Sequence, residues 1–158
     1  MTSTMADPMT STDRIEKKVV LRAPIDRVWR AISDSRQFGE WFGVKLNAPL
    51  ASGQKVQGKI TNPKYEHIQF EMEVERIEPQ TYFSYRWHPY AIDPKTDYSK
   101  EPTTLVEFHL EEVKEGTALT IIESGFDKIP ASRRVEAFRS NDNGWTGQAK
   151  QIAAYVEK

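Results

Sequence analysis

The chain contains no cysteine among its 158 residues. Without thiols it can form neither disulfides nor thiolate metal sites, and it has no cysteine nucleophile. A domain of this length needs no covalent staple, because about 68–70% of the surface of the unfolded chain becomes buried on folding. We therefore expect one domain held by its apolar core, in a reducing compartment, with the cytoplasm as the default location.

The chain also lacks an excess of charge and long hydrophobic runs. Its 22 basic and 23 acidic residues are interspersed and give a net charge of -1. This balance argues against nucleic acid or an anionic membrane surface as a partner. No apolar run approaches the roughly 20 residues of a membrane span, and the N-terminus lacks the features of a secretory signal. We expect no membrane insertion.

Common catalytic and cofactor motifs are absent as well. There is no G-x-S-x-G, no glycine-rich phosphate loop and no H-E-x-x-H. The three histidines, His67, His88 and His109, show no metal-ligand spacing on one element, so we interpret them as solvent-exposed. The sequence predicts no metal and no cofactor.

The first 13 residues contain only Met, Thr, Ser, Asp, Ala and Pro, without an apolar period. We interpret residues 1–13 as a disordered tail and residues 14–158 as the single domain.

Two helices are predicted near the start of the domain. Ile25, Val28, Trp29 and Ile32 follow helical spacing over residues 25–33, behind a proline that suits a first helical turn. The capping residues at 33–35 favour a second helix over 35–42.

Most of the remaining chain alternates between apolar and polar residues, as β-strands do. The clearest case is the stretch 68–77, in which Phe70, Met72 and Val74 alternate with glutamates. Strands are predicted over residues 14–22, 44–48, 54–61, 68–77, 82–88, 104–112 and 117–124.

A helix of more than 20 residues is predicted at the end of the chain, over residues 130–156. Gly144 and Gly147 lie within it, and we expect a bend or a close contact there. Its apolar stripe consists of Val135, Phe138, Trp145, Ala149, Ile152 and Val156.

This order of elements predicts an α+β fold of the helix-grip type. In such a fold a curved antiparallel β-sheet wraps around a long C-terminal α-helix, and two short helices follow the first strand. Only the last helix is long enough to cover the apolar face of the sheet.

Several motifs resemble one known family. They are A-P-x-x-R-V-W-R-A-I from residue 23, W-F-G from 41, G-T-x-L-T-I from 116, E-S-G-F from 123, and G-W at 144–145. In this order they are similar to the START-related SRPBCC superfamily, in the branch homologous to the C-terminal domain of the activator of heat-shock protein 90 ATPase. The resemblance covers residues 14–157 and implies the same helix-grip fold.

The resemblance also implies functions. Members of the superfamily include cavity enzymes, and the namesakes of this branch stimulate a chaperone ATPase. Those namesakes carry a separate N-terminal domain as well, which 13 residues are too few to form. A chaperone partner is therefore an alternative that ranks second.

A curved sheet and a straight helix leave a gap unless side chains fill it. The leading hypothesis is that a hydrophobic or aromatic small molecule binds in this gap. The competing interpretation is that the same aromatic residues are simply packed core. The candidate ligand-binding residues are Trp41, Phe42, Phe70, Met72, Phe83, Tyr85, Trp87, Phe108, Ile121, Glu123, Phe138, Asn141 and Trp145.

Glu123 is the sharpest candidate, because Leu119 and Ile121 set the inward side of its strand. A carboxyl group buried there would have a raised pKa and could serve as acid, base or ligand anchor. The alternative is that Glu123 lies at a wet rim. Arg76 falls on the same side of its strand as the apolar residues that point inward. It could therefore pair with Glu123, or lie at an exposed strand end.

Catalysis is left open and ranks below binding. A cyclase or hydrolase reaction would have to use Glu123 as acid or base. Many relatives carry a histidine where this chain has Asn141. That difference weakens a proton-transfer role, although an amide can still orient a ligand.

Overall fold

The computed structural model describes residues 13–65, 67–93 and 95–158. Residues 1–12 of the predicted tail lie outside the described residues. The order predicted from the sequence is confirmed: one strand, two short helices, six strands and a long helix. The elements are β1 (Arg14–Leu21), α1 (Ile25–Ser33), α2 (Ser35–Phe42), β2 (Val44–Leu46), β3 (Lys55–Ile60), the short 3-10 helix η2 (Pro63–Tyr65), β4 (Gln69–Glu78), β5 (Tyr82–Trp87), β6 (Thr104–Val113), β7 (Gly116–Ser124), a second 3-10 helix η3 (Phe126–Lys128) and α3 (Ala131–Val156).

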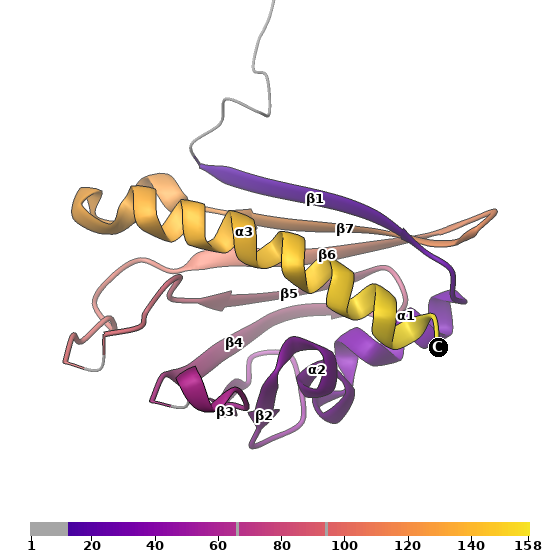
Figure 1. The fold of residues 1–158 in the computed structure, drawn as a ribbon, viewed down its shortest axis with the longest axis horizontal. Helices are drawn as coiled ribbons and strands as arrows, with labels where there is room; N and C mark the ends of the chain where they lie inside the picture. The colour runs from indigo at the N-terminus through magenta and orange to yellow at the C-terminus, as the bar shows by residue number, and fades with distance from the viewer. Residues whose placement is uncertain (1–12, 66, 94) are drawn as a thin grey trace, which may run out of the picture.

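Within the described residues the strands form one antiparallel sheet of seven, in the order β1-β7-β6-β5-β4-β3-β2. Helix α3 crosses one face of this sheet, and α1 and α2 lie near its C-terminal end (Figure 1). The loop between β5 and β6 lies at the opposite end (Figure 1). The predicted α+β helix-grip fold is confirmed.

Local chemistry explains how the two short helices begin and end. Pro24 precedes α1, and its carbonyl accepts hydrogen bonds from the first turn. The Asp34 side chain accepts a hydrogen bond of 3.0 Å from the backbone N–H of Gln37 and so caps α2. Gly43 ends α2 with a φ of 93°, a conformation that glycine adopts at little cost.

The strand faces agree with the alternation in the sequence. Phe70, Met72 and Val74 of β4 are buried, while the glutamates between them are exposed. One prediction for α3 is wrong, because Val135 is 61% exposed and lies off the buried stripe. A bend or a close contact was expected at Gly144 and Gly147. No atom beyond the helix's own turns lies within 4 Å of a Cβ built at either glycine, so the close contact is absent.

Aromatic side chains fill most of the space between α3 and the sheet. Phe38, Tyr85, Phe83 and Phe108 are fully buried, and Trp41 is almost so. Neighbouring rings pack with centroids 5.0–6.4 Å apart, in both edge-on and stacked pairs. The predicted gap is therefore largely occupied by core, and the hollows that predicted site residues line lie around Trp87 and Asn141. Every helix among the described residues is too short or too polar to span a lipid bilayer.

Two helical glycines give a matched test of the packing. A Cβ at Gly39 would lie 2.1 Å from the carbonyl oxygen of Val44, so Gly39→Ala forces α2 away from β2. We expect that variant to lower the free energy of unfolding by about 1–3 kcal/mol. Gly147→Ala meets open space and should raise it by about 0.5–1 kcal/mol through helix propensity. Urea unfolding measures both, and a stable Gly39→Ala variant would contradict the packing described.

Candidate functional site

The carboxylate of Glu123 lies at the centre of the site and is fully buried. The indole N–H of Trp145 donates to its Oε1 at 2.7 Å, and the indole N–H of Trp87 donates to its Oε2 at 2.8 Å. The Thr104 hydroxyl donates to Oε2 at 2.6 Å. The amide of Asn141 donates to both oxygens, at 2.9 and 3.1 Å. Four donors therefore saturate one carboxylate.

The fold brings these donors together from three elements. Glu123 lies near the end of β7, opposite Val106 of β6. Trp87 is the last residue of β5 and pairs with Thr104, the first residue of β6. Asn141 and Trp145 lie one helical turn apart on α3 and so present the same face to the sheet. The site thus joins the long helix to three neighbouring strands.

Burial raises the pKa of Glu123 above its usual value, and this is the largest influence on it. The hydrogen bonds from Thr104, Trp87, Trp145 and Asn141 act in the opposite direction, because they stabilise the ionised form. Of the two alternatives for Arg76, pairing with Glu123 is excluded and the exposed position on its strand holds. The register of β4 and β5 shifts between Val74 and Arg76, and the exposed Arg76 forms an ion pair with Glu78.

Tyr85 lies on β5 close to this carboxylate and is also fully buried. Its hydroxyl has no hydrogen-bond partner among the described residues. Burial raises the pKa of Tyr85 well above its usual value, and the negative charge of Glu123 adds to the shift. The hydroxyl therefore stays protonated, inside the core.

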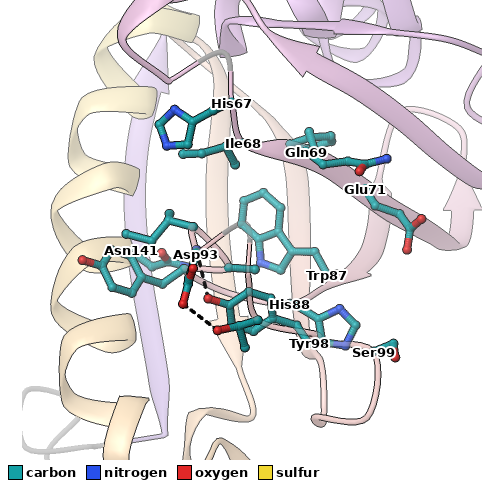
Figure 2. Close-up of a pocket in the computed structure, with 15 residues that line it drawn as sticks. His67, Ile68, Gln69, Glu71, Trp87, His88, Asp93, Tyr98, Ser99 and Asn141 are labelled. Carbon is teal, nitrogen blue, oxygen red and sulfur yellow. Dashed lines mark hydrogen bonds between the residues drawn. The ribbon is translucent and has the colours of Figure 1, made fainter.

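A pocket of about 490 Å³ opens beside this cluster, at the end of the sheet away from α1. Figure 2 shows Trp87 in its wall, with His67 and Ile68 on one side and Asp93 and Tyr98 on another. We call it the main pocket. It is lined by His67, Ile68, Gln69, Phe70, Glu71, Trp87, His88, Tyr90, Ala91, Ile92, Asp93, Thr96, Tyr98, Ser99 and Asn141.

A smaller hollow of about 90 Å³ lies against α3. We call it the crevice. Its walls are Phe42, Trp87, Asn141, Gly144, Trp145 and Gln148. Trp87 and Asn141 line both hollows and both donate to Glu123. The buried carboxylate therefore lies directly behind the wall that the two hollows share.

Arg133 of α3 holds the β5–β6 loop that forms one side of the main pocket. Its guanidinium donates to the Glu101 carboxylate at 2.7 Å and to the backbone carbonyls of Pro89 and Tyr90 at 3.1 and 3.0 Å. It also lies 4.8 Å from the centre of the Tyr98 ring. One side chain thus ties both ends of this loop to the helix.

The structure separates the predicted site residues into two groups. Those that line a hollow are Phe42, Phe70, Trp87, Asn141 and Trp145. Those packed in or against the core without lining either hollow are Trp41, Met72, Phe83, Tyr85, Phe108, Ile121 and Phe138. Glu123 is buried behind the wall, so the alternative of a wet rim is excluded.

Sequence reasoning missed the β5–β6 loop and Gln148. Tyr90 and Tyr98 in a proline-containing loop were the available signal, because large aromatic residues outside regular elements often contact ligands. His88 was interpreted as solvent-exposed, but it is partly buried, and its Nε2 lies 3.1 Å from the Glu101 carbonyl oxygen. No group of three His, Asp or Glu side chains in the described part of the chain is placed to hold a metal.

We expect Glu123→Gln to lower the free energy of unfolding by about 1–3 kcal/mol at neutral pH. Either orientation of the new amide turns its NH₂ group toward an indole N–H, of Trp145 or of Trp87, and leaves a donor unpaired. Urea unfolding of the two proteins measures the loss.

The difference between these two proteins should also depend on pH. Because the pKa of Glu123 is raised in the folded state, the pH-dependent part of its contribution to stability is complete below the ordinary value of 4.5 and is lost as the pH rises through the folded-state pKa. The stability advantage over Glu123→Gln should therefore shrink from pH 4.5 upward. If the advantage instead grows with pH, the four hydrogen-bond donors lower the pKa of Glu123 by more than burial raises it.

Removal of the Tyr85 hydroxyl should not destabilise the protein, because that group is buried without a partner. We expect Tyr85→Phe to raise the free energy of unfolding by about 1 kcal/mol. Tyr82→Phe is the control, since its hydroxyl donates to Glu107 at 2.9 Å and its loss should not stabilise the fold. Destabilisation by Tyr85→Phe in thermal unfolding would refute this assignment.

Comparisons with known proteins agree with this architecture. DynU16, from the dynemicin biosynthetic locus, shares 27% identity over 92% of this chain and 48% of its own, with a TM-score of 0.71. The chain thus spans about half the length of DynU16. MLL2253 from Mesorhizobium loti shares 23% identity over 90% of this chain and 96% of its own, with a TM-score of 0.71. An Arthrobacter aurescens protein reaches a TM-score of 0.73 at 17% identity, over 92% of this chain and 86% of its own.

No curated protein matches the chain significantly. The sequence profile described as "Activator of Hsp90 ATPase homolog 1-like protein" matches residues 22–157, which is most of the described domain. The chain therefore belongs to the Activator of Hsp90 ATPase homolog 1-like family, within the SRPBCC superfamily.

Proposed function

We propose that this protein binds a small apolar or aromatic molecule in the main pocket. The observation that carries the proposal is a hollow of about 490 Å³ whose wall is fixed from behind by the buried Glu123 carboxylate. Ligand pockets typically measure about 300–1,000 Å³ and combine apolar walls with placed polar groups. The main pocket lies in this size range, and its wall mixes apolar and aromatic side chains with polar ones.

The apolar contribution comes from Ile68, Phe70, Trp87, Tyr90 and Ile92. Burial of an apolar ligand against such side chains yields about 25 cal/mol per Å² of surface removed from water. The aromatic rings also favour planar ligands, because stacked and edge-on ring pairs add about 0.5–1.5 kcal/mol each. The ligand predicted from the sequence, hydrophobic or aromatic, suits this lining.

The polar contribution comes from side chains that are already held in place. Asn141 is fixed by Glu123, and His88 is bonded to the Glu101 carbonyl. Arg133 holds the loop that carries Tyr90 and Tyr98. A pocket held in its binding geometry loses less conformational entropy when a ligand enters. DynU16, which comes from a biosynthetic locus, gives a related protein in a setting of small-molecule chemistry.

Binding is preferred over acid–base catalysis because of the state of Glu123. All of its acceptor positions are taken by four donors of the protein, and it lines neither hollow. A group that cannot reach the ligand anchors the wall instead of exchanging protons with it.

The four tryptophans allow the proposal to be tested by NMR of the indole N–H groups. Trp87 lines the main pocket, whereas Trp29 and Trp41 line neither hollow. We expect at least one of indole, 2-naphthol and dodecanoic acid, titrated to millimolar concentration, to shift the Trp87 resonance while leaving that of Trp29 in place.

Two variants in which an alanine is replaced by tryptophan provide the control. Ala91→Trp adds bulk to the wall of the main pocket, whereas Ala51→Trp adds it to an exposed loop elsewhere. Ala91→Trp should weaken binding by at least about tenfold, a change of about 1.4 kcal/mol, and Ala51→Trp should not. If none of the three compounds shifts Trp87 in the folded protein, or if both variants bind equally well, the proposal is wrong.

A further inference from the structure

The crevice contains a side-chain carbonyl whose direction is set by Glu123. The Asn141 amide nitrogen donates to both carboxylate oxygens, at 2.9 and 3.1 Å. An amide that points its nitrogen at a carboxylate must turn its oxygen away from it. Among the described residues, no donor is bonded to the Asn141 oxygen. Asn141 therefore offers a free acceptor in the wall shared by the two hollows.

Gln148 supplies a second carbonyl, which is also oriented by a hydrogen bond from the nitrogen of the same amide. Its amide nitrogen donates to the backbone carbonyl of Phe42 at 2.9 Å, which directs its Oε1 the other way. That oxygen is buried, and no donor among the described residues reaches it. A buried acceptor without a partner costs about 1–3 kcal/mol, so its place in the wall of a hollow calls for an explanation.

Most donors of the same walls are already engaged. The indole N–H groups of Trp87 and Trp145 both bond to Glu123, as does the Asn141 amide. The Gln148 amide bonds to Phe42. The crevice thus combines aromatic faces with two side-chain carbonyl oxygens that accept no hydrogen bond from the described residues, while both indole N–H groups and one N–H of each amide are engaged.

Gly144 keeps this space open. It lies on α3 between Asn141 and Gln148 and lines the crevice, and no atom lies within 4 Å of a Cβ built there. Glycine inside a helix costs about 1 kcal/mol relative to alanine. No contact among the described residues requires a glycine at this position, whereas a side chain here would narrow the crevice.

We propose that the crevice binds a hydrogen-bond donor, a hydroxyl or an N–H, carried on the apolar or aromatic body of the ligand. The donor would bond to the carbonyl oxygens of Gln148 and Asn141, while Phe42, Trp87 and Trp145 contact the ring that carries it. This inference rests on the proposed function, because the shared wall makes the crevice a polar subsite of the main pocket.

Phenol and toluene test the inference, since they have nearly the same shape and differ in one donor. We expect phenol to shift the indole resonances of Trp87 and Trp145 and the side-chain amide resonance of Gln148. Its dissociation constant should be at least about tenfold lower than that of toluene. Toluene is the more hydrophobic of the two, so apolar burial alone predicts the opposite order.

Two glycines of α3 provide matched variants. Gly144→Leu adds a side chain to the crevice wall, and Gly147→Leu adds one at a residue of the same helix that lines neither hollow. The phenol response should be lost in Gly144→Leu and kept in Gly147→Leu. Gln148→Met, which has no acceptor carbonyl, should reduce the preference for phenol over toluene.

Three outcomes would overturn the inference. One is equal binding of phenol and toluene, as expected if ordered water meets the two carbonyls. Another is a phenol response that survives Gly144→Leu. The third is the absence of any shift at Trp145 with either compound. If the larger compounds still shift Trp87 in that case, the main pocket remains a binding site and only the crevice assignment fails.

Discussion

A carboxylate buried away from water is the constraint on which this site depends. An isolated buried charge is costly, and the fold compensates for it with hydrogen bonds from four donor groups to Glu123. The donors come from the end of β5, the start of β6 and the middle of α3. To satisfy one side chain, the long helix must therefore lie in one position relative to three strands.

This constraint divides the interior into two parts. Toward α1 and α2, the aromatic rings of Phe38, Trp41, Phe83 and Phe108 pack edge-on and face-on and line neither hollow. On the other side of the Glu123 cluster, Trp87 and Asn141 become the wall of an open pocket, and Arg133 holds the loop across from them. The same hydrogen bonds that stabilise the buried carboxylate thus orient the amide and indole groups that a ligand would meet.

The fold was largely predictable because it follows from periodicity. Period-2 alternation in residues 68–77 and 104–112, and helical spacing in 25–33, each identify an element and its buried face. The same alternation also predicted that Glu123 points inward. The hydrogen-bond partners of Glu123 could not be predicted, because they depend on how the strands and the helix align in three dimensions. The register shift between Val74 and Arg76, which leaves Arg76 exposed, is an example.

The pocket was harder to predict for a similar reason. The inward faces of the strands were identified correctly, but most of their aromatic residues fill space instead of lining it, as Phe83, Tyr85 and Phe108 show. The main pocket depends on the β5–β6 loop, which has no period to detect, and on an ion pair between Arg133 and Glu101, 32 residues apart in the chain. Such contacts are visible only in three dimensions.

Hydrogen exchange of the tryptophan indole N–H groups, followed by NMR in the protein without ligand, tests the central claim most directly. If Glu123 holds Trp145 and Trp87, both protons should exchange far more slowly than those of an exposed indole, and Trp145, which is almost fully buried, should be the slower of the two. Exchange of both protons at the rate of a free indole would contradict the account, because the carboxylate would then not be bonded to them.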